Sequence, residues 1–372
     1  MPRSSVFVNL NNQPQFSQMN CSLRGSSHRE KLLKWYLGHK RSMPWRAEIN
    51  AAPNPYYVLV SEFMLQQTTV QTVIPYFDRF IERFPTLNDL ASSCLDDVYS
   101  FWQGLGYYSR AKNLHQAAIQ IQKLESFPND IETLQTLPGI GPYTSASIAA
   151  IAFDRPVMPI DGNVMRVVSR LFILDEPKGP KLHTRVKEKV QIFAGINDNT
   201  HSAQALMELG ALICKPRNPS CQQCPLSDEC KAFQNNSIDK YPQLVAKPVK
   251  PKRTATAYYI INESDQVLVV KRPDKGLFAN MFVFPTDMFD FDSSLLLNFV
   301  QIEGAEKPTE HVPIKHIFSH FDLELSIIHG KITGKFMGES IKFGSWVSSC
   351  DLKKIGMPTL MRKVIKAVQK IN

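Results

Sequence analysis

Two acidic residues occupy sequence surroundings that favour opposite protonation states. Glu62 lies in the apolar run 59–65, on a segment with a helical pattern, and burial of a carboxyl group favours its neutral, proton-donating form. Asp161 precedes Gly162 and a second helical run, where an N-cap carboxylate stays ionised in the helix dipole. Such a pair can cleave a glycosidic bond through an oxocarbenium-like state. The plainer alternative is a solvent-facing glutamate and an ordinary helix cap.

A glycine-rich turn lies between these two acids. Residues 137–141 are Leu-Pro-Gly-Ile-Gly and are followed by a helical run. A turn of this kind directs backbone N–H groups to one point beside a helix N-terminus, where they bind phosphate oxygens without reading base sequence. Gly139 and Gly141 are therefore predicted to hold the backbone of a nucleic acid.

Four of the seven cysteines share one short loop. They follow the spacing C-x6-C-x2-C-x5-C, at Cys214, Cys221, Cys224 and Cys230. Four thiolates on such a loop bind either a tetrahedral zinc ion or a cubane iron-sulfur cluster, and the spacing alone leaves the metal open. Lys215 and Arg217 would place positive charge on this loop, which suggests a phosphate-binding segment that the metal orders.

Helical patterns extend from residue 28 to residue 230 and must position these groups. Apolar residues recur at helical spacing from Pro55 to Val70 and over 71–84, 86–103, 110–124, 131–137 and 142–153. The first part of the chain is therefore predicted to be a nearly all-helical domain over 28–230. Residues 1–27, which are rich in Asn, Gln and Ser, are predicted to form a disordered leader.

The sequence pattern changes after Cys230. Residues 231–253 end in prolines and basic residues, which predicts an extended basic linker. Beyond it, a final amphipathic helix is expected over 357–370. Strands are expected in segments rich in Val, Ile, Phe and Tyr, namely 255–262, 266–272, 280–285, 314–331 and 341–347. Residues 254–372 are thus predicted to be a smaller α+β domain.

The overall composition fits a protein that meets a polyanion. Of the 372 residues, 43% are hydrophobic, which is enough for two cored domains. The 43 Lys and Arg against 34 Asp and Glu give a net charge of +9. No apolar run approaches the roughly 20 residues of a membrane span. Clustered cysteines favour a reducing cytoplasm over a secretory disulfide framework, so we expect a cytoplasmic protein with no membrane partner.

Together these features resemble the helix-hairpin-helix DNA glycosylases of the endonuclease III superfamily. Within it, residues 43–46, 61–68, 104–110 and 161–164 resemble the adenine DNA glycosylase (MutY) branch. The resemblance implies a mainly α helix-hairpin-helix glycosylase fold with a 4Fe-4S cluster on the cysteine loop. It also implies a DNA repair enzyme, bacterial in type and associated with the nucleoid. That enzyme acts as a monomer on double-stranded DNA with an adenine:8-oxoguanine or adenine:guanine mispair.

The same resemblance assigns roles to individual residues. It implies that Glu62 protonates the leaving adenine and later handles the water, while Asp161 stabilises the sugar cation. Tyr143 stands where the lyases of the superfamily carry a lysine that attacks the sugar, so a monofunctional glycosylase that leaves an abasic site is implied. The other residues it implicates line the pocket of the flipped adenine or enter the DNA stack, and they are Asn163, Arg41, Trp45, Gln204, Gln67 and Tyr107.

The second domain resembles, more thinly, the Nudix-like domain with which adenine glycosylases inspect the opposite strand for 8-oxoguanine. Residues 276–285 carry this likeness, but the sequence has no glutamate-rich Nudix helix for magnesium, so nucleotide hydrolysis is not expected. Ser319 and His320 match the lesion-reading loop, where their side chains would bond to the purine edge.

Two alternative functions stay open at this stage. One is a pyrimidine-lesion glycosylase with lyase activity, like endonuclease III, and Tyr143 argues against it. The other is a catalytically silent damage-binding or redox iron-sulfur protein, and the presence of both Glu62 and Asp161 argues against that. Adenine excision is the function that we predict.

Overall fold

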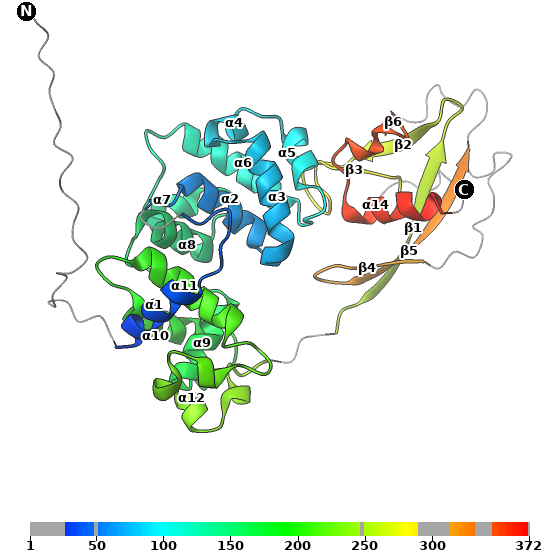
Figure 1. Cartoon of the computed structure of the whole chain (residues 1–372). Helices are drawn as coiled ribbons and strands as arrows, with labels where there is room; N and C mark the ends of the chain where they lie inside the picture. The colour runs from blue at the N-terminus through cyan, green and yellow to red at the C-terminus, as the bar shows by residue number, and fades with distance from the viewer. Residues whose placement is uncertain (1–26, 48–50, 246–248, 289–312, 332–343, 371–372) are drawn as a thin grey trace, which may run out of the picture.

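The computed structural model describes residues 27–47, 51–245, 249–288, 313–331 and 344–370. The helices form one body, and the strands form a second body together with the last helix, α14 (Figure 1). The expected leader lies outside the described residues except for Ser27, where the first helix begins. None of the helices in these ranges is long and apolar enough to cross a membrane.

The helical body consists of short helices that capping residues start at defined points. Asn54 accepts the N–H of Tyr56 at 2.9 Å, and Asp130 accepts that of Thr133 at 2.8 Å. The longer helices are α1 (Ser27–His39), α2 (Pro55–Leu65), α3 (Val70–Arg83), α6 (Ser109–Gln122), α8 (Pro142–Phe153), α9 (Gly162–Phe172), α10 (Pro180–Lys189) and α11 (Asn199–Leu212). The shorter ones are α4 (Leu87–Ala91), α5 (Leu95–Trp102), α7 (Ile131–Thr136) and α12 (Lys231–Gln234).

Helix α2 lies at the centre of the helical body. It packs against α3, α6 and α8, and its apolar side chains Leu59, Val60 and Phe63 are fully buried. A helix that is apolar on every face has no side to offer to water. Its one acidic residue, Glu62, is consequently held in the interior, as the sequence predicted.

Two expected helical segments differ from the structure. The segment from Pro55 to Val70 ends as a helix at Leu65, and Val70 begins α3. Residues 86–103 form two helices, α4 and α5, and not one. The Ser93 hydroxyl donates to the Leu90 carbonyl oxygen at 2.7 Å, and Cys94 then takes an extended conformation before α5. Serine side chains that bond to the local backbone compete with helical hydrogen bonds, so the apolar periodicity alone did not reveal this break.

The second body is a mixed sheet covered by a helix, which confirms the predicted α+β class. Strand β1 (Lys252–Ile261) pairs in parallel with β5 (Asp322–Lys331), and the other pairings are antiparallel. Helix α14 (Thr359–Val368) buries its apolar face against this sheet. The remaining strands are β2 (Gln266–Lys271), β3 (Phe282–Val283), β4 (Ile314–Ile317) and β6 (Gly344–Ser348).

Several expected bounds in this half need correction. Strand β1 begins at Lys252 and α12 lies at 231–234, so both ends of the expected linker 231–253 are ordered. The expected strand 314–331 is a hairpin of β4 and β5, closed where Phe318 donates to the Phe321 carbonyl oxygen at 2.9 Å. Residues 246–248 and 341–343 lie outside the described ranges. No glycine or proline marks the turn at 318–321, so the sequence pattern did not show it.

The two bodies touch through a small set of specific contacts. The Tyr108 hydroxyl donates to the Met357 carbonyl oxygen at 3.1 Å. A Cβ on Gly356 would lie 3.1 Å from the Tyr99 Cβ, so these two segments of the chain approach closely. Phe278 packs against the apolar cores of both bodies. These contacts fix the position of the sheet beside the α5–α6 loop of the helical body.

Candidate active site

A cleft of about 690 Å³ opens in the helical body. Glu62 of α2, Tyr143 of α8 and Asp161, which precedes α9, all line it. The cleft also brings together five other residues that the sequence singled out, namely Arg41, Trp45, Gln67, Asn163 and Gln204. Trp45 is largely buried, and its ring meets that of Phe77 edge-on at 5.3 Å.

Glu62 keeps its proton to a much higher pH than an exposed carboxyl group does. Burial raises the pKa of its carboxyl group to about 7, against the opposing effect of the Ser147 and Tyr143 hydroxyls, and the negative charge of Asp161 adds to the increase. Within the described part of the chain, Glu62 Oε2 has no hydrogen-bond partner. An unpartnered buried carboxyl oxygen is one that a bound substrate can satisfy. The Tyr143 hydroxyl stays protonated because burial and the charges of Glu62 and Asp161 raise its pKa well above the usual value.

Two hydrogen-bond donors hold the Asp161 carboxylate at the start of α9. Its Oδ1 accepts the N–H of Val164 at 2.7 Å, and its Oδ2 accepts an N–H of the Asn163 side chain at 2.8 Å. Arg166 Nη2 in turn donates to Asn163 Oδ1 at 2.9 Å, while its Nε donates to the Cys214 carbonyl oxygen at 2.8 Å. A chain of hydrogen bonds therefore connects Asp161 with the cysteine loop.

A glycine on α11 permits this arrangement. A Cβ on Gly210 would lie only 2.5 Å from the Asn163 Cβ, so no larger residue fits without moving α9. The Gly210 carbonyl oxygen also accepts from Arg166 at 2.8 Å. Gly210 and Arg166 support the site, and neither was predicted from the sequence.

The predicted hairpin lies behind α2. Gly139 has φ of 76°, which favours glycine, and a Cβ there would lie 2.9 Å from Phe63 Cε1. Gly141 precedes α8 and has open space around its Cα. The turn is thus fixed to the helix that carries Glu62, outside the cleft lining, with the N-terminal end of α8 accessible.

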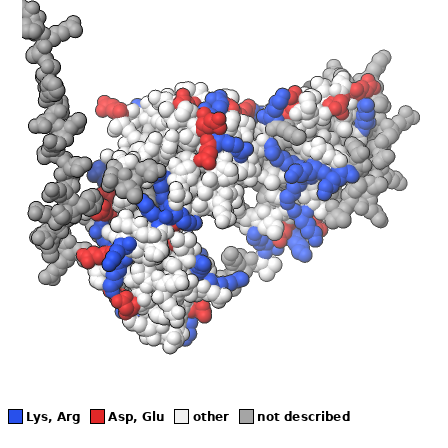
Figure 2. Space-filling model, viewed as in Figure 1, with Lys and Arg blue, Asp and Glu red and all other residues white. Residues whose placement is uncertain are grey.

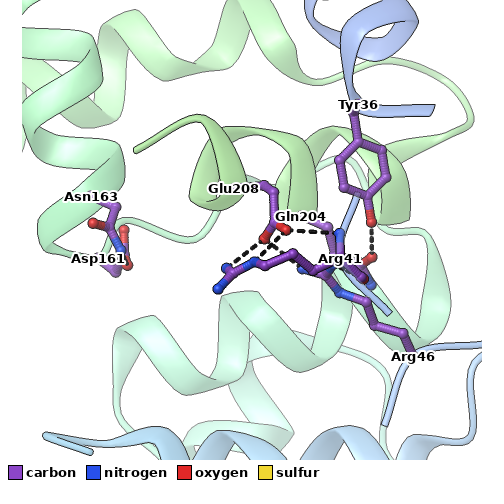
Figure 3. A network of polar contacts seen from close by, with 7 residues as sticks. All are labelled: Tyr36, Arg41, Arg46, Asp161, Asn163, Gln204 and Glu208. Carbon is purple, nitrogen blue, oxygen red and sulfur yellow. Dashed lines mark hydrogen bonds and ion pairs between the residues drawn. The ribbon is translucent and has the colours of Figure 1, made fainter. Parts of the chain in front are cut away.

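A network of buried charges forms another wall of the cleft, and its centre, Glu208, was also missed. Glu208 accepts from Arg41 Nε at 2.7 Å and from Arg46 Nη2 at 3.0 Å (Figure 3). Burial alone would raise the pKa of Glu208, but the two guanidinium groups lower it to about 2. The Tyr36 hydroxyl donates to Gln204 Oε1 in the same network. Glu208 follows Gln204 by one helical turn, a spacing that was available as a signal.

The remaining predicted residues lie around the cleft. Gln67 is exposed at its rim, and Tyr107 is 48% exposed on the α5–α6 loop. Ser319 and His320 form the tip of the β4–β5 hairpin, in the other body, and do not line the cleft. The Tyr107 hydroxyl and Ser319 Oγ lie 3.3 Å apart, so the hairpin meets the helical body beside the cleft.

The four cysteines gather on the loop that follows α11. Burial raises the pKa of Cys221, and the nearby sulfurs of Cys214 and Cys230 raise it further. Arg170 Nη1 donates to Cys214 Sγ at 3.4 Å, and a guanidinium stabilises the thiolate that binds iron. Within the described ranges no three His, Cys, Asp or Glu side chains meet at one metal ion. In a cubane cluster each iron binds one cysteine thiolate, so the four cysteines need not converge on a single metal ion.

Comparison with known proteins gives consistent matches in both bodies. Residues 60–191 match the HhH-GPD superfamily of base excision DNA repair proteins, 214–230 the iron-sulfur binding domain of endonuclease III, and 256–367 the NUDIX domain. The adenine DNA glycosylase of Buchnera aphidicola subsp. Schizaphis graminum is 32% identical, over 90% of this chain and 96% of its own. The human adenine DNA glycosylase is 31% identical over 92% of this chain and 74% of its own.

The chain belongs to the adenine DNA glycosylase family.

Family membership confirms the main predictions from the sequence. An adenine DNA glycosylase is a base excision repair enzyme. Membership of this family argues against both alternatives, the catalytically silent iron-sulfur protein and the pyrimidine-lesion glycosylase with lyase activity. The iron-sulfur match confirms the 4Fe-4S cofactor over zinc. The four cysteines of the matched segment, Cys214, Cys221, Cys224 and Cys230, are the residues that would hold it. When bound, the cluster crosslinks this loop. In this adenine DNA glycosylase the loop in turn supports Asp161 through Arg166.

Proposed function

We propose that this enzyme removes adenine paired with 8-oxoguanine or guanine, with Glu62 as general acid and Asp161 as the anion that stabilises the sugar cation. The observation that carries the proposal is the pairing, in one cleft, of a carboxyl group with a pKa of about 7 and a carboxylate with two hydrogen-bond donors. The first can give a proton to a leaving purine, and the second can neutralise an oxocarbenium-like centre.

Water, and not an amine, is the proposed nucleophile. Tyr143 lies beside Glu62 and its hydroxyl stays protonated, so this position offers no amine that could form a Schiff base. After adenine leaves, the Glu62 carboxylate is placed to accept a proton from the water that attacks the sugar. The products are free adenine and an abasic site with an intact strand.

Adenine enters the cleft after it is flipped from the duplex. Arg41, Trp45 and Gln204 are the proposed contacts of the base, Asn163 supports Asp161, and Gly139 and Gly141 hold a phosphate. Lys and Arg side chains that gather around α14 and β4 support DNA binding by the sheet body as well (Figure 2). We propose that Ser319 and His320 contact the base opposite adenine.

We also propose the domain division that the sequence predicted, with a glycosylase domain at 28–230, a connecting segment at 231–253 that includes α12 and the start of β1, and a lesion-recognition domain at 254–372. Two separate apolar cores support it. We also propose that the enzyme acts as a monomer. None of the described cysteines forms a disulfide, which supports the proposed cytoplasmic location.

Single-turnover assays on duplexes with each mispair test this proposal. Wild type, Glu62→Gln and Asp161→Asn are incubated with DNA, and alkali then reveals abasic sites. We expect product from wild type and almost none from either variant, while Glu82→Gln, which changes an exposed acid on α3, retains full activity. Undiminished product from both site variants would contradict the mechanism. A covalent complex trapped by borohydride would contradict attack by water.

A further inference from the structure

Two exposed side chains beside the cleft share a rare backbone conformation. Gln67 has φ of 58° and Tyr107 has φ of 48°, in the left-handed region that residues with a Cβ seldom adopt. Such conformations persist only where surrounding contacts fix them, and they mark segments that must keep one shape. Gln67 ends the turn after α2, whereas Tyr107 lies on the α5–α6 loop, so they are far apart in sequence.

A single buried guanidinium holds both loops. Arg110 is only 6% exposed, and its Cζ lies 5.5 Å from the centre of the Tyr107 ring. Its Nη2 also lies 3.4 Å from Thr68 Oγ1, the residue after Gln67. Its Nη1 and Nη2 atoms donate to the carbonyl oxygens of Phe63, Met64, Gln66, Leu105 and Gly106, at 2.8, 2.9, 2.6, 3.2 and 3.2 Å respectively.

We propose that Arg110 is a positioning residue that sets the spacing between Gln67 and Tyr107, so that both side chains enter the base stack together when adenine leaves it. This inference rests on the proposed function. Extrusion of a base costs unstacking energy, which inserted side chains offset only if they are already in place. A planar guanidinium can reach carbonyl groups on two loops at once, whereas a lysine ammonium acts as one point charge on a flexible stem.

The spacing set by Arg110 extends to the sheet body. Tyr107 meets Ser319 through its hydroxyl, with 3.3 Å between the two oxygens. The side chain that fills the stack therefore also contacts the hairpin proposed to read the opposite base. Loss of Arg110 is expected to loosen both loops and this contact together.

The test compares Arg110→Lys with a matched variant, Arg29→Lys. Arg29 is also buried and donates to backbone carbonyl oxygens, those of Phe193 and Asn197, but it does not line the cleft. Each protein is assayed in single turnover on two DNAs. One is the fully paired duplex with the mispair, and the other carries the same adenine between unpaired neighbours, so that it is already unstacked. The ratio of the two rates does not depend on the fraction of protein that is folded.

We expect Arg110→Lys to lose about 100-fold on the paired duplex and little on the unstacked adenine, while Arg29→Lys keeps the wild-type ratio. With 2-aminopurine in place of adenine, the increase in fluorescence that reports unstacking should be lost in Arg110→Lys although DNA still binds. Equal losses on both DNAs, or no loss on either, would overturn the inference. A wild type that excises from neither DNA would instead overturn the proposed function.

A second variant, Gly106→Ala, tests the inference if the Arg110→Lys protein does not fold. Gly106 has φ of 72° and open space around it, so Gly106→Ala strains the loop before Tyr107 without touching the buried core. The same change in the rate ratio is expected, in smaller degree. An unchanged ratio in Gly106→Ala would count against the inference.

Discussion

Two glutamates line the same cleft and are almost equally buried, yet their pKa values are shifted in opposite directions. Glu62 is 5% exposed and Glu208 is 1% exposed, but the pKa of Glu62 is about 7 and that of Glu208 about 2. Apolar side chains and neutral hydroxyls surround the first, whereas two guanidinium groups hold the second. Burial makes a charged carboxyl group costly, and the nearest charged groups then decide which form of the carboxyl group is stable.

The largest test of this contrast is Glu62→Gln. The amide keeps the shape of the side chain but has no proton to transfer, so we expect adenine excision to fall by about 10² to 10⁴. Single-turnover rates measure the loss. Folding is expected to be retained because the neutral amide resembles the protonated carboxyl group, and retention is checked by the absorbance of the cluster. A loss below tenfold would remove Glu62 from its role as general acid.

The pH dependence of stability should also follow Glu62. Its folded pKa lies above the unfolded value of 4.5, so the folded state binds more protons between pH 4.5 and 7. Stability therefore falls as pH rises, by about 1.4 kcal/mol per pH unit and about 3 kcal/mol in all. Urea unfolding at several pH values measures this slope. Glu62→Gln should flatten it in this window, and an identical slope in the variant would show that other groups cause it.

Glu208→Gln should lower the free energy of unfolding. It leaves Arg41 and Arg46 without their anion. Loss of one partner from a buried ion pair costs about 3 to 5 kcal/mol, and we expect about 2 to 3 kcal/mol because Arg41 is 37% exposed. Thermal unfolding measures the change. The conservative variant Glu208→Asp should have a stability between those of wild type and Glu208→Gln. A Glu208→Gln protein as stable as wild type would contradict the stabilising role of the two guanidinium groups.

The smallest expected effect is that of Tyr143→Phe. The Tyr143 hydroxyl lowers the pKa of Glu62, so its removal should raise that pKa by under about one unit, the size of one neutral hydrogen bond. The falling limb of the pH profile for excision should move to higher pH. Tyr56→Phe is the matched control, because the Tyr56 hydroxyl bonds to the Phe84 carbonyl oxygen away from the cleft. A shift to lower pH in Tyr143→Phe would contradict the assigned effect.

The sequence revealed groups whose chemistry depends on local spacing. Glu62 in its apolar run, Asp161 before a helix and Gly139 in the hairpin were all predicted because their neighbours in sequence are also their neighbours in space. The four-cysteine loop was predicted for the same reason. The mainly helical first body and the α+β second body followed from periodicity.

The sequence did not reveal groups whose partners are distant along the chain. Glu208 meets Arg41 across 167 positions, and no periodicity relates them. Gly210 matters only because α11 happens to approach Asn163. Tertiary packing decides where Glu208 and Gly210 lie, and local patterns carry no record of it. The break between α4 and α5 and the β4–β5 turn are different cases, because a local hydrogen bond that apolar periodicity does not show is found at each.

The parallel pairing of β1 with β5 has a consequence for the order of folding. Ala255 pairs with Leu325 and Ile261 with Lys331, so the central ladder of the sheet closes only after most of that body has left the ribosome. The helical body precedes the sheet in sequence, and within it α4 and α5 pack against α6, a near neighbour in the chain. Contacts of high sequence separation form slowly. During synthesis, the body that holds the cleft should therefore mature first, which pulsed hydrogen exchange on nascent chains would show as protection of α2 before β1.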